Sequence, residues 1–162
     1  MTAVMALMMT LVACKKDKDD KNKDPKDAVE FDLTIDKGLE LHDEYWGGYT
    51  TISWMPDNKF AISDNSGSNH SSCIFDIGEV EGLYAIEKIP WHGGVKSIDC
   101  IVGHGYVFQT YVGRSGVGYL LDYLRLYVIA TILDNSGNTI GIKVKYQYPF
   151  KDYELDYEVE GN

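Results

Sequence analysis

From residue 31 onward, apolar and polar residues alternate along the chain with a period of two. Alternation of this kind puts successive side chains on opposite faces, and it is typical of half-buried β-strands rather than of helices. Residues 31–35, with the sequence FDLTI, show it most clearly. Residues 82–90 are the one place where a helical turn is expected. Strands are predicted at residues 31–35, 51–55, 60–63, 73–77, 97–102, 106–112, 119–133, 140–148 and 153–159.

Runs of turn-forming residues separate these segments. Residues 56–59 (PDNK) and 134–138 (DNSGN) carry the proline, aspartate, asparagine and glycine that tight turns accept. Many short strands joined by such turns are typical of sandwiches and barrels. The sequence therefore predicts an all-β fold: a single antiparallel β-sandwich or partly closed barrel.

The last two predicted strands are expected to form a hairpin across a turn at residues 149–152. In an even-numbered turn the lysines of one strand would face the acids of the other, and each cross-strand pair would contribute about 0.2–1 kcal/mol. The charged final strand would then lie at the edge of the sheet and protect it from aggregation. The predicted pairs are Lys145 with Asp156, Lys143 with Glu158, Tyr146 with Leu155 and Val144 with Tyr157.

Charge limits the partners of this domain. The net charge is −10, and all of it belongs to the residues after Glu30, where nine basic residues stand against nineteen acidic ones. Binding to a nucleic-acid backbone needs clustered lysine and arginine, so no nucleic-acid partner is expected. The length of 162 residues suits one domain.

The N-terminal part of the chain has a different character. Residues 2–13 form an uncharged apolar run, which is too short to span a bilayer but suits the core of a signal peptide. The first three residues lack lysine and arginine, which signal peptides normally carry, so the true start is expected upstream. Residues 15–27 are almost all lysine and aspartate, a composition that cannot bury surface. The alternative to a signal peptide is that residues 1–14 are a frayed apolar terminus with a chance cysteine at position 14.

The junction of these two segments, Leu11-Val12-Ala13-Cys14, resembles the lipobox of bacterial lipoproteins. The resemblance implies cleavage before Cys14 and lipid attachment to its sulfur and amino group. Two or more acyl chains hold a protein durably at a membrane. The expected division is residues 1–13 as signal peptide, 14–30 as lipidated cysteine and disordered charged tether, and 31–162 as the β domain.

The charged run after the cysteine is similar to the export signal of Bacteroides-type lipoproteins. That similarity implies an outer-membrane location, on the periplasmic face or the cell surface. Residues 103–107 (GHGYV), 125–128 (RLYV) and 144–150 (VKYQYPF) resemble a family of small Bacteroides-type lipoproteins of unassigned function. This second resemblance implies a mainly β secreted domain and carries no catalytic residue.

Metal and catalytic motifs are weak. His42, Asp43 and Glu44 are adjacent, so on a strand they point to opposite faces and cannot hold one ion together unless a loop curls them toward it. Residues 64–69 offer oxygen ligands of the kind calcium takes, but the same DNSG recurs at 134–137, where turn chemistry explains it. Residues 113–116 (GRSG) fall one residue short of a GxSxG elbow. We expect no metal site and no cofactor.

Cys73 and Cys100 lie in predicted strands, and a disulfide between them is one alternative to two buried thiols. Aromatic residues of two loop-like segments, Tyr45, Trp46 and Tyr49 in the first and Trp91 in the second, are candidates for a sugar-binding platform, with buried packing as the alternative. Trp54 lies within a predicted strand and is expected in the core.

The sequence favours a non-catalytic lipoprotein of the cell envelope that binds a ligand or partner, such as a glycan or another envelope protein. A structural component that pairs through an exposed edge strand is the alternative, and a bare, uncharged edge would favour it. A hydrolase would require two carboxylates facing each other across a cleft.

Overall fold

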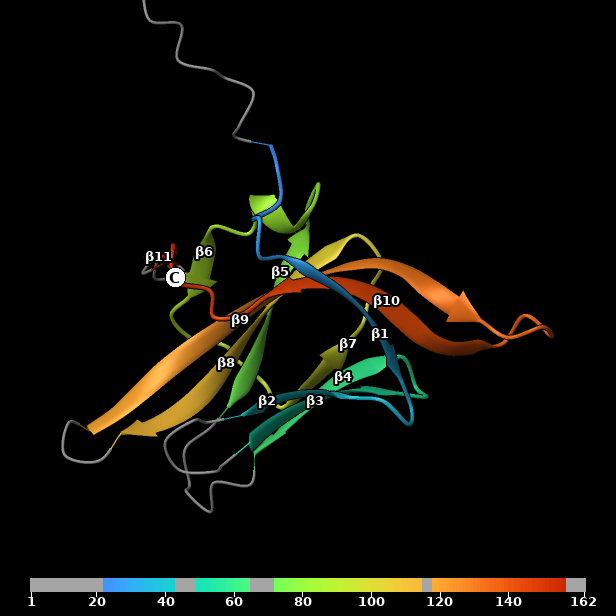
Figure 1. Cartoon of the computed structure of the whole chain (residues 1–162), viewed down its shortest axis with the longest axis horizontal. Helices are drawn as coiled ribbons and strands as arrows, with labels where there is room; N and C mark the ends of the chain where they lie inside the picture. Colours follow the sequence, from blue (N-terminus) through green and yellow to red (C-terminus); the bar gives the residue numbers. More distant parts are fainter. Residues whose placement is uncertain (1–21, 43–48, 65–71, 115–117, 157–162) are drawn as a thin grey trace, which may run out of the picture.

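The computed structural model of the chain describes residues 22–42, 49–64, 72–114 and 118–156, whose two main β-sheets pack face to face (Figure 1). All neighbouring strands within both sheets run antiparallel, and the sheets do not close into a barrel. The predicted sandwich is confirmed. The larger sheet contains β1 (Val29–Thr34), β5 (Cys73–Glu79), β8 (His104–Arg114), β9 (Gly118–Leu133) and β10 (Thr139–Gln147), in the order β1-β10-β9-β8-β5. The smaller sheet contains β2 (Leu39–His42), β3 (Tyr49–Met55), β4 (Lys59–Asp64) and β7 (Ser97–Asp99), in the order β2-β3-β4-β7.

The main hydrophobic core fills the space between the two sheets. Its residues come from the inward positions of the alternating strands, as the period of two requires. Phe60 lies at the centre, with its ring edge-to-face against Tyr106 at 4.9 Å and Phe108 at 5.4 Å between centroids. Trp54 is buried in this core, as predicted.

A second layer covers the outer face of the larger sheet. It consists of β6 (Lys88–Pro90), β11 (Glu154–Asp156), which pairs with β6 in parallel, and the short 3-10 helix η2 (Leu83–Ala85). Phe150, Leu83 and Ile89 pack in this layer and form a separate hydrophobic cluster with residues of the sheet. The helical turn expected within residues 82–90 is therefore η2. Among the described residues, no helix is long and apolar enough to span a bilayer.

This second layer buries side chains of β9 that alternation alone places on a partly exposed face. Tyr123 and Arg125 are both buried, because η2 and the C-terminal segment lie over them. The Arg125 guanidinium donates to the backbone oxygen of Ile86 at 2.6 Å and to Oε1 of Gln147 at 2.7 Å, and it stacks over the ring of Phe150. The period of two within residues 119–133 predicts partial exposure for Tyr123 and Arg125, and this prediction is wrong for both.

The predicted turns at residues 56–59 and 134–138 are confirmed. Asn58 has a φ of 59° and its N–H donates to the backbone oxygen of Met55, which closes the turn between β3 and β4. In the second turn the Asp134 carboxylate accepts hydrogen bonds from the backbone N–H groups of Ser136 and Asn138. These bonds lower the pKa of Asp134, led by the one from Asn138, as expected for an aspartate that stabilises a turn.

The predicted hairpin between the last two strands was wrong. β10 lies between β9 and β1, where Lys145 is opposite Glu30 and Lys143 is opposite Asp32. The ion pairs measure 3.4 Å and 3.5 Å. β11, which carries Asp156, instead pairs with β6. Both β1 and β11 carry two acids that are two residues apart. β1 also contributes Leu33 to the main core, whereas β11 contributes no residue to that core.

The chain joins the domain earlier than residue 31. β1 begins at Val29. Earlier in the chain, the Asp24 carboxylate forms an ion pair with Lys145 Nζ at 2.9 Å and accepts a hydrogen bond from the backbone N–H of Tyr84. Asp27 accepts hydrogen bonds from the side-chain amide of Gln147. The last residues of the expected tether therefore belong to the folded domain. Strands β2 and β6 were not predicted from the sequence.

Candidate binding surface

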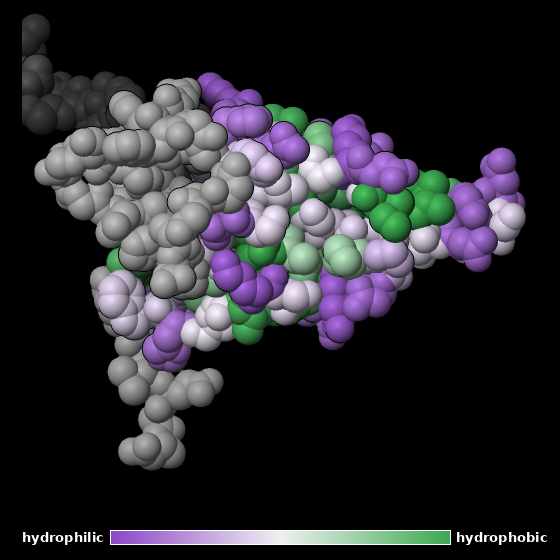
Figure 2. Space-filling model, turned by 90° about the horizontal axis from the view of Figure 1, so that it is seen from below, coloured by the Kyte–Doolittle hydropathy of each residue, from purple (hydrophilic) through white to green (hydrophobic). Residues whose placement is uncertain are grey.

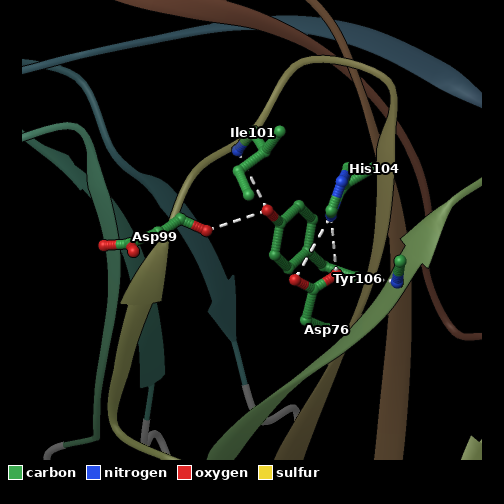
Figure 3. Close-up of polar contacts among 6 residues, drawn as sticks. Asp76, Asp99, Ile101, His104 and Tyr106 are labelled. Carbon is green, nitrogen blue, oxygen red and sulfur yellow. Dashed lines mark hydrogen bonds and ion pairs between the residues drawn. The ribbon is translucent and has the colours of Figure 1, made fainter.

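The connection between β7 and β8, residues 100–103, is held by the buried phenol of Tyr106 (Figure 3). The Tyr106 hydroxyl donates to the backbone oxygen of Asp99 at 2.8 Å and accepts from the backbone N–H of Ile101 at 3.0 Å. Burial raises the pKa of this phenol, so it stays protonated and keeps its donor role at every physiological pH. One side chain thus fixes the first part of the loop, on either side of Cys100.

The turn between β3 and β4 holds the same loop from another side. Asn58 donates from its side chain to the backbone oxygen of Cys100 at 2.8 Å, and its own backbone oxygen accepts from Cys100 N–H at 2.9 Å. The indole N–H of Trp54 donates to the Asn58 side chain and fixes its orientation. At the far end of the loop, Gly103 N–H donates to the backbone oxygen of Val128 at 2.9 Å. The backbone of this loop is therefore fixed along its length.

Two aliphatic side chains project from this fixed backbone into solvent. Ile101 is 43% exposed and Val102 is 48% exposed. Exposed aliphatic residues on an ordered backbone are suited to binding, because little conformational freedom remains to be lost when a partner covers them. This loop is therefore an ordered apolar feature of the surface that the described residues form.

His104 and Asp76 form a polar pair beside the loop (Figure 3). The His104 Nδ1 atom lies 3.1 Å and 3.3 Å from the two carboxylate oxygens of Asp76, and Gly78 N–H donates to the same carboxylate. A carboxylate on Nδ1 orients the ring and leaves Nε2 for another group. Nucleophilic catalysis would need a hydroxyl or thiol at Nε2, and none of the residues that the structure describes is placed there. The pair can accept or donate a hydrogen bond to a bound partner.

Beyond this loop, β9 extends farther than its neighbour β8. Pairing between β8 and β9 runs from the connection that joins them to Gly105, which lies opposite Tyr127. Among the described strands, residues 129–133 of β9 therefore have only β10 beside them. A β-bulge sits at this point, where Val128 and Ala130 are opposite consecutive residues of β10. Bulges increase strand twist, and Figure 1 shows the β9–β10 hairpin running out beyond the body of the sandwich. We call residues 129–141 the distal arm.

The free edge of the distal arm is uncharged, unlike the other edges of the larger sheet. Residues 129–133 read IATIL. Edge strand β1 carries Glu30 and Asp32, and both backbone groups of its last residue, Thr34, are bonded to Lys37. Edge strand β5 is bridged by Val95 opposite Ile74. Charge and covering segments are the usual protection of sheet edges, and within the described part of the chain residues 129–133 have neither.

The structure separates the two candidate aromatic residues that it describes, Trp91 and Tyr49. Trp91 follows β6 in the outer layer and is 62% exposed, whereas Tyr49 begins β3 in the smaller sheet, on the other side of the larger sheet. Tyr49 is exposed and lies against the ring of His42, at 6.3 Å between centroids. Tyr45 and Trp46 lie outside the described residues, as does Cys14.

The two remaining cysteines are free thiols in different clusters. Cys100 is buried in the main core, whereas Cys73 packs against the outer cluster, so the disulfide considered from the sequence is not formed. Burial raises the pKa of Cys100 to about 12 and also raises that of Cys73. Both thiols are therefore protonated at neutral pH and serve as small apolar residues.

The metal candidates fall mostly on residues that the structure does not describe. Asp43, Glu44 and residues 65–69 lie outside it, and Asp64 accepts a hydrogen bond from Ser72 at 2.9 Å. Within the described ranges, no three histidine, cysteine or acidic side chains are grouped as a metal site would require.

The distal arm was not predicted from the sequence as a surface feature. The signal that could have indicated it is the length of two neighbouring predicted strands: residues 106–112 are too few to cover residues 119–133 as a partner.

No family model, no curated protein and no solved structure matches this chain.

Proposed function

We propose that the chain is a lipoprotein of the outer membrane, anchored through Cys14, whose sandwich binds an envelope partner without catalysing a reaction. The observation that carries the binding role is the fixed loop at residues 100–103, which displays Ile101 and Val102 beside the His104–Asp76 pair. The apolar run followed by Cys14 and the charged segment supports the anchor.

The domain is suited to a position close to the membrane. Among the described residues, Asp24 already contacts the folded domain, ten residues after Cys14. Ten residues reach about 35 Å when fully extended and span roughly 17 Å on average as a flexible chain. The anchor would thus keep the binding surface within reach of partners in the same membrane.

A sugar ligand is a second candidate, which the exposure of Trp91 favours. An indole ring that is 62% exposed at the end of a strand can stack on the apolar face of a sugar. A Trp91→Ala form that lost binding to an immobilised glycan array, with a Tyr49→Ala form unchanged, would favour this candidate.

Changing Cys14 to alanine is expected to move the protein from the membrane fraction to the soluble fraction of a diderm bacterium. The reason is that no acyl chain can then be attached, and two or more chains are what makes such anchoring durable. The measurement is membrane sedimentation followed by immunoblotting, with protease treatment of intact cells to establish the exposed leaflet. A Cys73→Ala form, which leaves the lipobox intact, is the matched control. Equal fractionation of wild type and the Cys14→Ala form would overturn the anchor.

The same strain tests the binding role. A photo-crosslinking residue at position 102 is expected to give discrete adducts with a second envelope protein, whereas one at exposed Leu121 is not. Absence of adducts from position 102 would overturn the loop as the binding surface and leave the anchoring result unaffected.

A further inference from the structure

The edge of the distal arm exposes unpaired backbone groups. Residues 129–133 have β10 on one side, and on the other side the described residues provide no backbone hydrogen-bond partner beyond Gly103 at Val128. A row of unpaired N–H and C=O groups at a sheet edge is a template for another strand. β1 already lies on the other side of β10 over residues 141–143, so the strand edge that lacks a partner here is that of β9.

Exposed aliphatic side chains surround this edge. Leu133 is 55% exposed, and Ile140, on the other strand of the arm, is exposed as well. Figure 2 shows hydrophobic side chains directly behind the hydrophilic tip of the arm. The other end of the edge is at Val128, whose backbone oxygen accepts a hydrogen bond from the N–H of Gly103. Ile101 and Val102, which immediately precede Gly103, are exposed at that end. Apolar surface is therefore present at both ends of the unpaired edge.

The edge is also self-complementary. If two copies of residues 129–133 run antiparallel about a twofold axis at Thr131, Thr131 is opposite Thr131 of the second copy. Ile129 is then opposite Leu133 of the second copy, and Ala130 is opposite Ile132 of the second copy. Apolar pairs and threonine pairs are favourable across strands. No charged residue occurs in the segment, so the net charge of −10 causes no like-charge pair at the contact itself.

We infer that two copies of this chain associate through the free edge of β9, pairing residues 129–133 antiparallel to join the two larger sheets. A twofold contact of this kind closes on itself and does not propagate into a fibre. The same register places Leu133 of one copy beside the point where Gly103 of the other meets Val128. The arm of each copy would then extend the apolar surface of Ile101 and Val102 on its partner. Self-association does not depend on the proposed lipid anchor or on any envelope partner.

Cross-linking tests the register directly. A Thr131→Cys form of the full chain is expected to give a covalent dimer under mild oxidation, because residues facing each other across antiparallel strands have Cβ atoms about 4.5–5.5 Å apart. Thr139→Cys, an exposed position on the other strand of the arm, is the matched control and should give no covalent dimer. Equal cross-linking at positions 131 and 139 would overturn the pairing.

A charge exchange at the axis provides the second test. Thr131→Asp and Thr131→Lys would each place like charges opposite each other, and each should raise the dimer dissociation constant about 30-fold in analytical ultracentrifugation. Mixing the two variants should restore dimers, since the introduced carboxylate of one chain would face the introduced ammonium group of the other. Wild-type protein that stays monomeric, or variants that dimerise as the wild type does, would contradict the inference. A photo-crosslinking residue at position 131 that gave adducts with a different envelope protein would assign the edge to that protein. That result would also overturn the inference.

Discussion

Replacing Tyr106 with alanine is expected to lower the free energy of unfolding by about 4 kcal/mol. The ring is fully buried and packs edge-to-face against Phe60, so its removal leaves a large cavity in the main core. Tyr106→Phe keeps the ring and removes only the hydroxyl, which leaves the backbone groups of Asp99 and Ile101 without this partner. Its expected cost is about 1–2 kcal/mol.

Denaturation with guanidinium chloride measures both costs, and amide hydrogen exchange separates them. Tyr106→Phe should increase exchange at the Ile101 amide while the central strands keep their protection, because the hydroxyl acts on the loop and the ring acts on the core. Tyr146→Phe is the control: Tyr146 is partly buried on β10 with its ring against Phe31, and its change should stay within about 0.5 kcal/mol. Equal destabilisation by the Phe and Ala forms of Tyr106 would refute this division.

Replacing Arg125 with alanine is expected to cost about 3 kcal/mol. The substitution removes the donor to the buried Ile86 oxygen and the contact with the Phe150 ring, and it leaves Oε1 of Gln147 without this partner. A buried acceptor left without a hydrogen bond costs about 1–3 kcal/mol, and the lost packing adds to that. The second layer over the larger sheet should loosen first.

Arg125→Met is the matched control, because it keeps most of the side-chain volume and removes the charge. Burial lowers the pKa of Arg125, which shows that desolvation opposes its charged form, while Asp27 and other acids nearby act in the opposite direction. Relief of that desolvation should keep the cost of methionine below half that of alanine. Thermal unfolding of the three forms gives the order. Methionine as costly as alanine would show that the charge, and not the packed stem, holds this layer.

The two largest expected effects lie on opposite sides of one sheet. Tyr106 joins the main core to the loop that displays Ile101 and Val102, whereas Arg125 joins the sheet to its outer layer. Variants of Arg125 should therefore leave the apolar loop intact. This separation allows stability and binding to be changed independently.

Local sequence accounts for much of the candidate surface but not for its assembly. The turn at Asn58 was predicted from its composition, and its contact with Cys100 was not, since the two residues are 42 positions apart. Nothing in the sequence pointed to the pairing of His104 with Asp76 across two strands. Long-range pairs of this kind depend on which strands are neighbours.

The sequence by itself determined that this domain is built from strands, where most of them run and where its turns fall. The physical reason is that alternation and turn chemistry act over a few residues, so each segment carries its own signal. Tertiary structure alone decided which strands pair. Lys143 and Lys145 could meet equally spaced acids on β1 or on the C-terminal segment, and β1 is the partner because it also places Leu33 in the main core. The buried Arg125, the free thiols and the uncharged edge of the distal arm follow from that arrangement of strands, since each depends on what covers a strand rather than on what the strand contains.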